Sequence, residues 1–298
     1  MAPDLKSSAG VGVESAEGDC DSLNTSTQFF AQLHHSGGRR SELSSETATE
    51  SDRWIRSYLP GPAEALHLVH FPHAGGSASY YRPFCTSLSD RFNALALQYP
   101  GRQDRRDEPC VTDLHVLADL LFDRLRQCAD RPMAFFGHSM GALLAFEVTR
   151  RFERELNTSP VALFLSGRRA PSRHRDENVD LSSKESLLAE IRELSGTDPR
   201  LLGDDEMLEM IMEPLRADYR ALGAYRFAPE PPVRCPVTVL TGADDPRTSQ
   251  DEAAAWQEHT TGAFALRVFP GGHFFISENV ADVTGFVAER LSAVPLPG

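Results

Sequence analysis

A serine lies between two glycines in the pentapeptide Gly137-His138-Ser139-Met140-Gly141, and its hydroxyl is the first candidate nucleophile of the chain. The apolar residues 133–136 before it predict a buried strand, and residues 142–148 after it predict a helix. A serine at such a strand-to-helix turn presents its hydroxyl at the top of a sheet, as in a nucleophile elbow. The pentapeptide alone also fits a serine that caps a helix N-terminus, so other residues must decide between the two interpretations.

Two further chemical groups follow predicted strands. Asp244 and Asp245 come directly after strand 236–241, and His273 follows strand 264–269 in a glycine-rich loop. A serine hydroxyl becomes an effective nucleophile when a histidine accepts its proton and a carboxylate orients that histidine. The order serine, aspartate, histidine along the chain is that of α/β-hydrolases, so the sequence predicts a catalytic triad. Taken alone, His273 also fits an ordinary loop histidine.

An early strand, residues 66–71, runs into the segment Pro72-His73-Ala74-Gly75-Gly76. In these folds such a glycine-rich turn supplies one backbone N–H of the oxyanion hole, and the residue after the nucleophile supplies the second. We therefore predict Ala74 and Met140 as the donors, with a plain connecting loop as the alternative.

Three histidines in this region, His67, His70 and His73, could suggest a metal site. Their spacing of three places successive members on opposite faces of a strand, where they cannot converge on one ion. The sequence therefore predicts no metal site.

Composition narrows the class of protein. The 298 residues are 41% hydrophobic and carry a formal net charge of −13, which argues against nucleic acid as the main partner. No apolar stretch approaches the roughly 18 residues of a membrane helix. The first residues lack the pattern of a secretion signal, and the five scattered cysteines do not form a disulfide framework. We expect a cytoplasmic protein that does not enter membranes.

Residues 1–52 differ in kind from the rest of the chain. They are rich in Ser, Thr, Glu and Gly and carry few large apolar side chains besides Phe29 and Phe30. Such a segment buries too little apolar surface to offset its ordering entropy, so we predict a disordered tail. The alternative is a docking tail anchored by the two phenylalanines.

Strands and helices alternate over residues 53–298, which predicts one α/β domain with a mostly parallel sheet covered by helices on both faces. The expected strands are 66–71, 92–98, 133–137, 161–166, 236–241 and 264–269, and the expected helices are 77–89, 112–129, 140–156 and 277–292. Between about 176 and 228 the alternation stops. One helix is expected to open at a capping box in residues 182–185 and to run through Leu194, and a second is expected over 204–212. This α-helical insertion precedes the strand that carries the candidate aspartates, which is the position of the lid over the pocket in α/β-hydrolase folds.

Two clusters of arginines contrast with the negative net charge of the chain. Arg102 follows the strand that ends near Tyr99, and Arg168 and Arg169 follow the strand that ends at Ser166. In a parallel sheet both loops leave from the edge where open α/β sheets bind ligands. We predict a basic rim that docks an acidic partner, with ordinary solvated loops as the alternative.

With these residues in view, the chain resembles the type II thioesterases of polyketide synthases and nonribosomal peptide synthetases. The resemblance covers about residues 53–295, and its matching stretches are Phe71-Pro72-His73-Ala74-Gly75-Gly76, Tyr99-Pro100-Gly101-Arg102, Gly137-His138-Ser139-Met140-Gly141-Ala142, Ser166-Gly167-Arg168-Arg169-Ala170-Pro171, Ala243-Asp244-Asp245-Pro246 and Gly271-Gly272-His273-Phe274. The family's aspartate directly precedes a proline, which selects Asp245 over Asp244.

The resemblance implies an α/β-hydrolase fold and an editing hydrolase. Such enzymes remove unproductive acyl groups from the phosphopantetheine thiol of acyl or peptidyl carrier proteins. Ser139, Asp245 and His273 would be the triad, and no cofactor of the enzyme's own is implied. A small-molecule carboxylesterase and a non-catalytic ligand-binding protein on the same fold remain alternatives. The oligomeric state is left open.

Overall fold

The computed structural model describes residues 53–175, 179–193 and 205–294. The predicted disordered tail, residues 1–52, lies outside the described residues.

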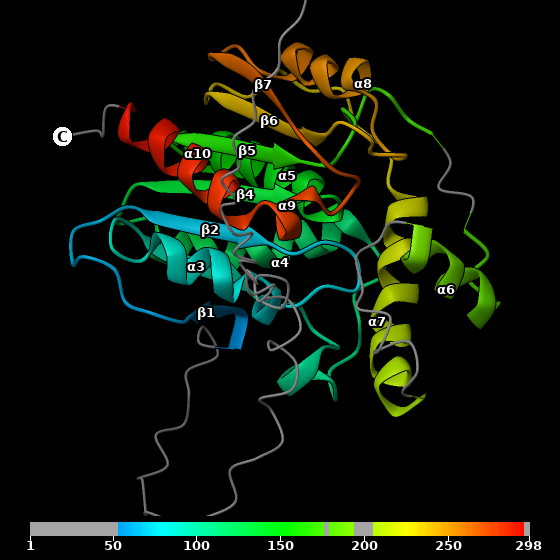
Figure 1. Ribbon diagram of the computed structural model, residues 1–298. Coiled ribbons are helices and arrows are strands. Elements are labelled where there is room, and N and C mark those ends of the chain that lie inside the picture. The colour runs from blue at the N-terminus through cyan, green and yellow to red at the C-terminus, as the bar shows by residue number, and fades with distance from the viewer. Residues whose placement is uncertain (1–52, 176–178, 194–204, 295–298) are drawn as a thin grey trace, which may run out of the picture. The chain divides into compact units, whose positions relative to one another are not determined.

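A seven-stranded sheet forms the centre of the described domain (Figure 1). Its order is β1-β3-β2-β4-β5-β6-β7, and every neighbouring pair is parallel except β1 with β3. The strands are β1 (Ile55–Ser57), β2 (His67–Phe71), β3 (Asn93–Leu97), β4 (Met133–His138), β5 (Ala162–Ser166), β6 (Val237–Gly242) and β7 (Phe264–Phe269). The predicted α/β class with a mostly parallel sheet is confirmed, and β1 is a strand that the sequence did not predict.

Helices pack on both faces of this sheet. In Figure 1, α3 and α10 lie in front of the sheet, with α4 and α5 behind it. The helices are α3 (Arg82–Leu88), α4 (Leu114–Leu125), α5 (Met140–Glu155), α8 (Gln250–Ala254), α9 (Phe275–Glu278) and α10 (Val280–Ser292), with short 3₁₀ turns η1 (Ala78–Tyr81), η2 (Gln103–Arg105), η3 (Arg126–Cys128) and η5 (Ala255–His259). Two clusters of buried side chains result, one containing α4 and α5 and the other containing α3 and α10.

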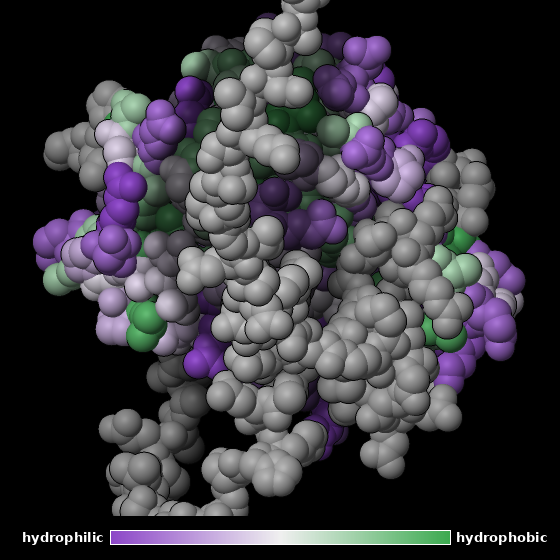
Figure 2. Space-filling view, viewed as in Figure 1, coloured by the Kyte–Doolittle hydropathy of each residue, from purple (hydrophilic) through white to green (hydrophobic). Residues whose placement is uncertain are grey.

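The central strands are hydrophobic on both faces, as parallel strands between two helix layers must be. Every residue of β4, β5 and β6 is buried, whereas the edge strand β7 is mostly half-buried. Three large hydrophobic residues are exposed in the described part of the chain, namely Leu59, Val116 and Leu156. Hydrophilic side chains, purple in Figure 2, cover much of the visible described surface.

The predicted insertion contains two helices, α6 (Lys184–Glu193) and α7 (Asp205–Ala224). We call these two helices the helical insertion. The sequence predicted that the second one ends near residue 212, but it continues through Pro214. A proline inside a helix costs about 3 kcal/mol, and α7 offsets this cost by burying Met212, Leu215, Tyr219 and Leu222. None of the described helices has the length and apolar character needed to cross a membrane.

Candidate active site

The structure brings Ser139, His273 and Asp245 together. His273 Nε2 lies 3.0 Å from Ser139 Oγ, and His273 Nδ1 lies 2.9 Å from Asp245 Oδ2 and 3.0 Å from Oδ1. The imidazole is 3% exposed and the carboxylate is fully buried. One ring nitrogen can therefore accept the serine proton while the other donates to the carboxylate, as proton transfer from a nucleophile requires.

Ser139 forms the turn between β4 and α5. Its backbone has φ 54° and ψ −115°, a sparsely populated conformation for a non-glycine residue. Ser139 occupies the N-cap position of α5, but its hydroxyl makes no capping hydrogen bond and contacts His273 instead. Its N–H donates to the carbonyl of Ser166 on β5 (2.8 Å), which fixes the turn. These contacts favour the nucleophile elbow over the helix cap.

The two glycines of the pentapeptide are required by close backbone approach. A Cβ on Gly137 would lie 2.1 Å from the carbonyl oxygen of Gly141, and a Cβ on Gly141 would lie 1.9 Å from that of Phe71. These positions leave no room for a larger side chain, so strand and helix can meet tightly enough to form the elbow.

The two adjacent aspartates occupy different environments. Asp245 bonds to His273, and its Oδ1 also accepts from the N–H of Arg247 (2.8 Å). Asp244 is exposed, and its N–H donates to the carbonyl of Gly271 (3.0 Å). That backbone bond joins the loop after β6 to the loop after β7. The geometry therefore favours Asp245 as the carboxylate of the triad. Asp244 contributes its backbone N–H to the contact between the two loops.

The predicted oxyanion-hole donors lie in the turn of residues 73–76 and at the start of α5. We call residues 73–76 the oxyanion turn. Gly76 N–H closes it by donating to His73 O (2.9 Å), and Gly75 N–H donates to Asp218 of α7 (2.7 Å). Among the described residues, no protein acceptor takes the N–H of Ala74 or of Met140. Both groups are therefore free to bind a substrate oxygen, as the prediction of an oxyanion hole requires.

Two further histidines surround His273. The ring of His138 lies 5.1 Å from that of His273, and the ring of His73 lies 6.0 Å from that of His138. Burial, with a smaller contribution from the nearby His273, lowers the pKa of His73 to about 3 and the pKa of His138 well below its usual value. Both rings are neutral at pH 7, so they place no competing positive charge beside His273 when it takes up a proton.

The predicted arginine rim needs correction. Arg102 and Arg169 are each only 4% exposed, so neither forms part of a surface that docks a partner. Arg102 pairs with the buried Asp218 and lies over the ring of Tyr99. The guanidinium of Arg169 donates to the carbonyls of Arg175 and Arg247. Both guanidinium groups are bound by acceptors inside the folded protein, and the sequence alone does not reveal these partners.

Arg168 differs from its neighbour because it is half-buried. Its carbonyl accepts a hydrogen bond from Trp256 Nε1 (2.8 Å), which anchors its backbone. Its docking role stays a prediction.

Sequence reasoning missed Asp218, which lies in α7 outside any recognised motif. It is 1% exposed and joins the helical insertion to the oxyanion turn.

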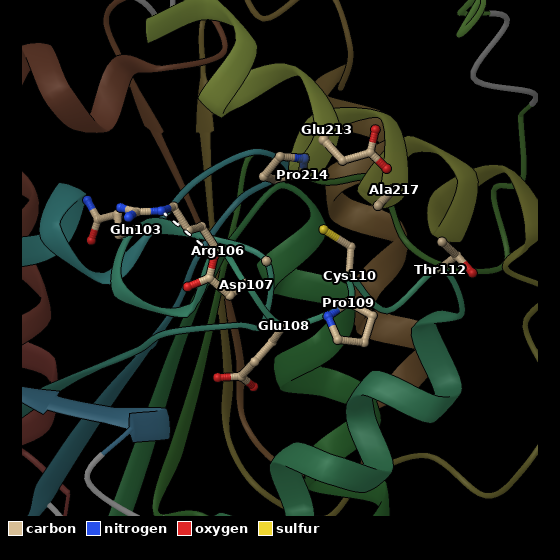
Figure 3. Close-up of a pocket in the computed structure, with 11 residues that line it drawn as sticks. Gln103, Arg106, Asp107, Glu108, Pro109, Cys110, Thr112, Glu213, Pro214 and Ala217 are labelled. Atoms are coloured by element: carbon tan, nitrogen blue, oxygen red, sulfur yellow. Dashed lines mark ion pairs between the residues drawn. The ribbon is translucent and has the colours of Figure 1, made fainter. Parts of the chain in front are cut away.

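A cavity of about 550 Å³ lies between α7 and the loop after β3, and Ala217 of α7 is among the residues that line it. Figure 3 shows Glu213, Pro214 and Ala217 on one side of this cavity and Cys110 on the other. The residues of the predicted triad do not line it, so the cavity is separate from the reacting groups.

Comparison with known proteins identifies the family. The model of the thioesterase domain family matches residues 66–291, which include every residue of the site described above. This chain belongs to the thioesterase family. It is an enzyme of the α/β-hydrolase fold, with the mostly parallel sheet described above.

Individual relatives agree with this assignment. The chain is 48% identical over 239 residues to a probable cadicidin biosynthesis thioesterase of Streptomyces griseus. That match covers 80% of the chain and 66% of the relative, just under two thirds of its length. The chain is 43% identical over 243 residues to the thioesterase PikA5 of Streptomyces venezuelae, covering 81% of the chain and 86% of the relative.

A solved structure has a similar fold. The type II thioesterase BorB from the borrelidin biosynthetic cluster superimposes with a TM-score of 0.76 at 48% sequence identity. The match covers 82% of this chain and all of BorB. At this identity the likeness extends beyond the fold to the sequence of the domain.

Proposed function

We propose that this thioesterase is a type II editing enzyme that hydrolyses acyl groups from the phosphopantetheine thiol of acyl or peptidyl carrier proteins in polyketide or nonribosomal peptide biosynthesis. One observation carries the proposal: the 3.0 Å contact from His273 Nε2 to Ser139 Oγ, continued to Asp245, within a thioesterase-family domain. The names of the relatives support the biosynthetic setting, since one is a probable cadicidin biosynthesis thioesterase and another is a type II thioesterase from the borrelidin biosynthetic cluster.

The reaction follows from the geometry in two halves. In the first, His273 Nε2 takes the proton of Ser139 Oγ while this oxygen bonds to the thioester carbonyl carbon. The N–H groups of Ala74 and Met140 hold the resulting oxyanion. The carbon–sulfur bond then breaks, and the carrier thiolate leaves with the proton from His273.

In the second half, His273 takes a proton from water, and the hydroxyl attacks the acyl–serine carbonyl. The ester bond breaks, the serine oxygen recovers a proton from His273, and a free carboxylic acid is released. Asp245 accepts a hydrogen bond from His273 throughout and stabilises the imidazolium. The enzyme supplies no cofactor of its own, because the phosphopantetheine arm belongs to the carrier protein.

Structure and composition support the setting that we propose. The four described cysteines, Cys85, Cys110, Cys128 and Cys235, are free thiols, which agrees with a reducing, cytoplasmic compartment. The net charge of −13 supports a protein or small-molecule substrate over nucleic acid.

One experiment separates the proposal from its two alternatives. The same acyl group is offered as a carrier-bound thioester and as a free ester, and hydrolysis of each is measured. Preference for the carrier-bound thioester supports the editing thioesterase, whereas preference for the free ester indicates a carboxylesterase. A serine-directed phosphonate is added in parallel. If it fails to label Ser139 and neither substrate is cleaved, the protein is a non-catalytic binder.

A further inference from the structure

A carboxylate of the helical insertion reaches the oxyanion turn. Asp218 Oδ2 accepts the N–H of Gly75 at 2.7 Å across 143 residues of sequence. The same residue is 1% exposed and forms an ion pair with Arg102. Gly75 directly follows Ala74, a proposed oxyanion donor, so Asp218 binds the N–H of the next residue along the chain.

Four-residue turns commonly adopt type I or type II geometry, and this hydrogen bond favours the geometry seen here. The bond from Gly76 N–H to His73 O closes a four-residue turn, and Gly75 has φ 71°. A positive φ at the third position is typical of a type II turn. In a type I turn the central peptide, here between Ala74 and Gly75, is flipped. An acceptor placed at the Gly75 N–H therefore fixes the orientation of the peptide that follows the oxyanion donor.

Arg102 keeps this acceptor in place. Its guanidinium donates to Pro100 O (2.8 Å) and lies 5.1 Å from the centre of the Tyr99 ring, and the Tyr99 hydroxyl donates to Pro72 O (3.2 Å). Burial raises the pKa of Asp218, and the Arg102 cation opposes this shift. The Pro-Gly-Arg segment, Asp218 and the oxyanion turn thus form one connected unit in the interior.

We propose that Asp218 is a positioning residue, which orients the oxyanion turn through the Gly75 N–H and so makes catalysis depend on the seating of α7. The inference rests on the proposed function, because it assigns Ala74 to the oxyanion hole. Leu215, also on α7, packs against the turn: a Cβ on Gly75 would lie 2.9 Å from its Cδ1. Displacement of α7 would remove both contacts, leaving the triad complete but the oxyanion turn unsupported.

Two double variants test the hydrogen bond apart from the charge. Arg102→Leu/Asp218→Asn and Arg102→Leu/Asp218→Leu both remove the buried ion pair, and replacing both partners avoids an unpaired buried charge. They differ in whether an oxygen remains for the Gly75 N–H. Loss of a whole oxyanion donor costs about 10²- to 10³-fold in kcat. We therefore expect the Leu/Leu variant to have a kcat at least about tenfold below that of the Leu/Asn variant, with similar KM for a small acyl thioester.

A matched control separates positioning from stability. Tyr225→Phe removes the hydrogen bond from Tyr225 to Glu147 (2.9 Å), which ties the chain after α7 to α5 without reaching the oxyanion turn. We expect it to lower the melting temperature and leave kcat near that of the wild type. If the two double variants have the same kcat, or if Tyr225→Phe loses as much kcat as the Leu/Leu variant, Asp218 is only structural.

A single variant covers the case in which the double variants do not fold. Asp218→Glu keeps the negative charge beside Arg102 but lengthens the side chain by one methylene, so the carboxylate can no longer occupy its present position at the Gly75 N–H. A lower kcat at unchanged KM supports the proposal, and an unchanged kcat overturns it. Wild-type hydrolysis is measured alongside: its absence defeats the proposed function, whereas its presence with unaffected variants defeats this inference alone.

Discussion

His273 Nε2 lies 3.0 Å from Ser139 Oγ, although 134 residues separate the two along the chain. The topology explains the contact. Ser139 follows β4, Asp245 follows β6 and His273 follows β7, and these strands are parallel members of one sheet. Because parallel strands end at the same edge, their loops meet there. The backbone bond from Asp244 N–H to Gly271 O then fixes the last two loops together.

The two neighbouring aspartates make a direct test of the triad. Asp245→Asn keeps the size of the side chain but removes the charge that orients and stabilises the His273 imidazolium. We expect kcat to fall by roughly 10⁴-fold, the loss that the equivalent change causes in a serine protease. Asp244→Asn changes an exposed side chain and should retain most activity. Steady-state hydrolysis of an acyl thioester measures both, and the reverse order would show that the carboxylate is misassigned.

Glycine substitutions test the tight packing of the elbow. Gly141→Ala would place a Cβ 1.9 Å from Phe71 O, so β2 or α5 must shift. We expect a loss of about 3 kcal/mol in the free energy of unfolding, the upper part of the range for overpacking. Gly285→Ala is the control, because a Cβ there meets nothing within 4 Å. This second change lies inside α10 and should stabilise the protein by about 0.5–1 kcal/mol. Urea unfolding compares the two, and equal stability of both variants contradicts the packing argument.

Buried neutral histidines should make the fold sensitive to mild acid. Burial lowers the pKa of His70 to about 4 and that of His73 to about 3. At a pH between 6.5 and these lowered pKa values, the histidines bind protons in the unfolded chain but not in the folded protein. Their contribution to stability is therefore fully present above pH 6.5 and is lost as the pH falls below it. Each of these histidines should lower the free energy of unfolding by about 2 kcal/mol at pH 5 relative to pH 7.

The variant His70→Leu isolates one of these contributions. It loses the contact of His70 Nδ1 with Leu95 O (2.9 Å), so it should be less stable than the wild type at pH 7. Its further loss between pH 7 and pH 5 should be smaller than that of the wild type by about 2 kcal/mol. Urea unfolding at the two pH values provides the measurement. An unchanged pH dependence would mean that His70 is not buried in its neutral form.

The docking prediction now concerns Arg168. We expect Arg168→Glu to raise KM for an acyl-carrier protein several-fold, because a reversed charge repels an acidic partner. Hydrolysis of a small thioester should be nearly unchanged. Arg91→Glu is the control: Arg91 precedes β3, at the opposite edge of the sheet from Ser139, and is exposed. Equal effects of Arg168→Glu on both substrates, or of both variants on the carrier substrate, would remove the docking role.

Much of the fold and of the arrangement at the site could be predicted from the sequence. The buried strands are short apolar runs bounded by glycine and proline, and the residues proposed as the triad follow such strands, where backbone turns must present side chains. The edge strand β1 was missed because it has only three residues and no hydrophobic alternation.

The remaining features depend on contacts between distant segments. The sequence predicts the second helix of the insertion only as far as residue 212, but α7 continues past Pro214, where Leu215, Tyr219 and Leu222 are buried. The sequence alone indicates a surface charge at Arg102, because its partner Asp218 lies 116 residues further along the chain. Asp218 itself follows no motif, and only its contact with Gly75 in the folded protein reveals it.

The central claim is tested most directly by mass spectrometry of a carrier protein whose phosphopantetheine arm bears an acyl group. The carrier is incubated with the wild-type enzyme and, separately, with Ser139→Ala, whose folding is checked by circular dichroism. We predict that the wild type removes the acyl mass and leaves the free thiol, and that Ser139→Ala leaves the acyl group in place. Equal deacylation by the two proteins, or an intact acyl group after incubation with the wild type, would contradict the account.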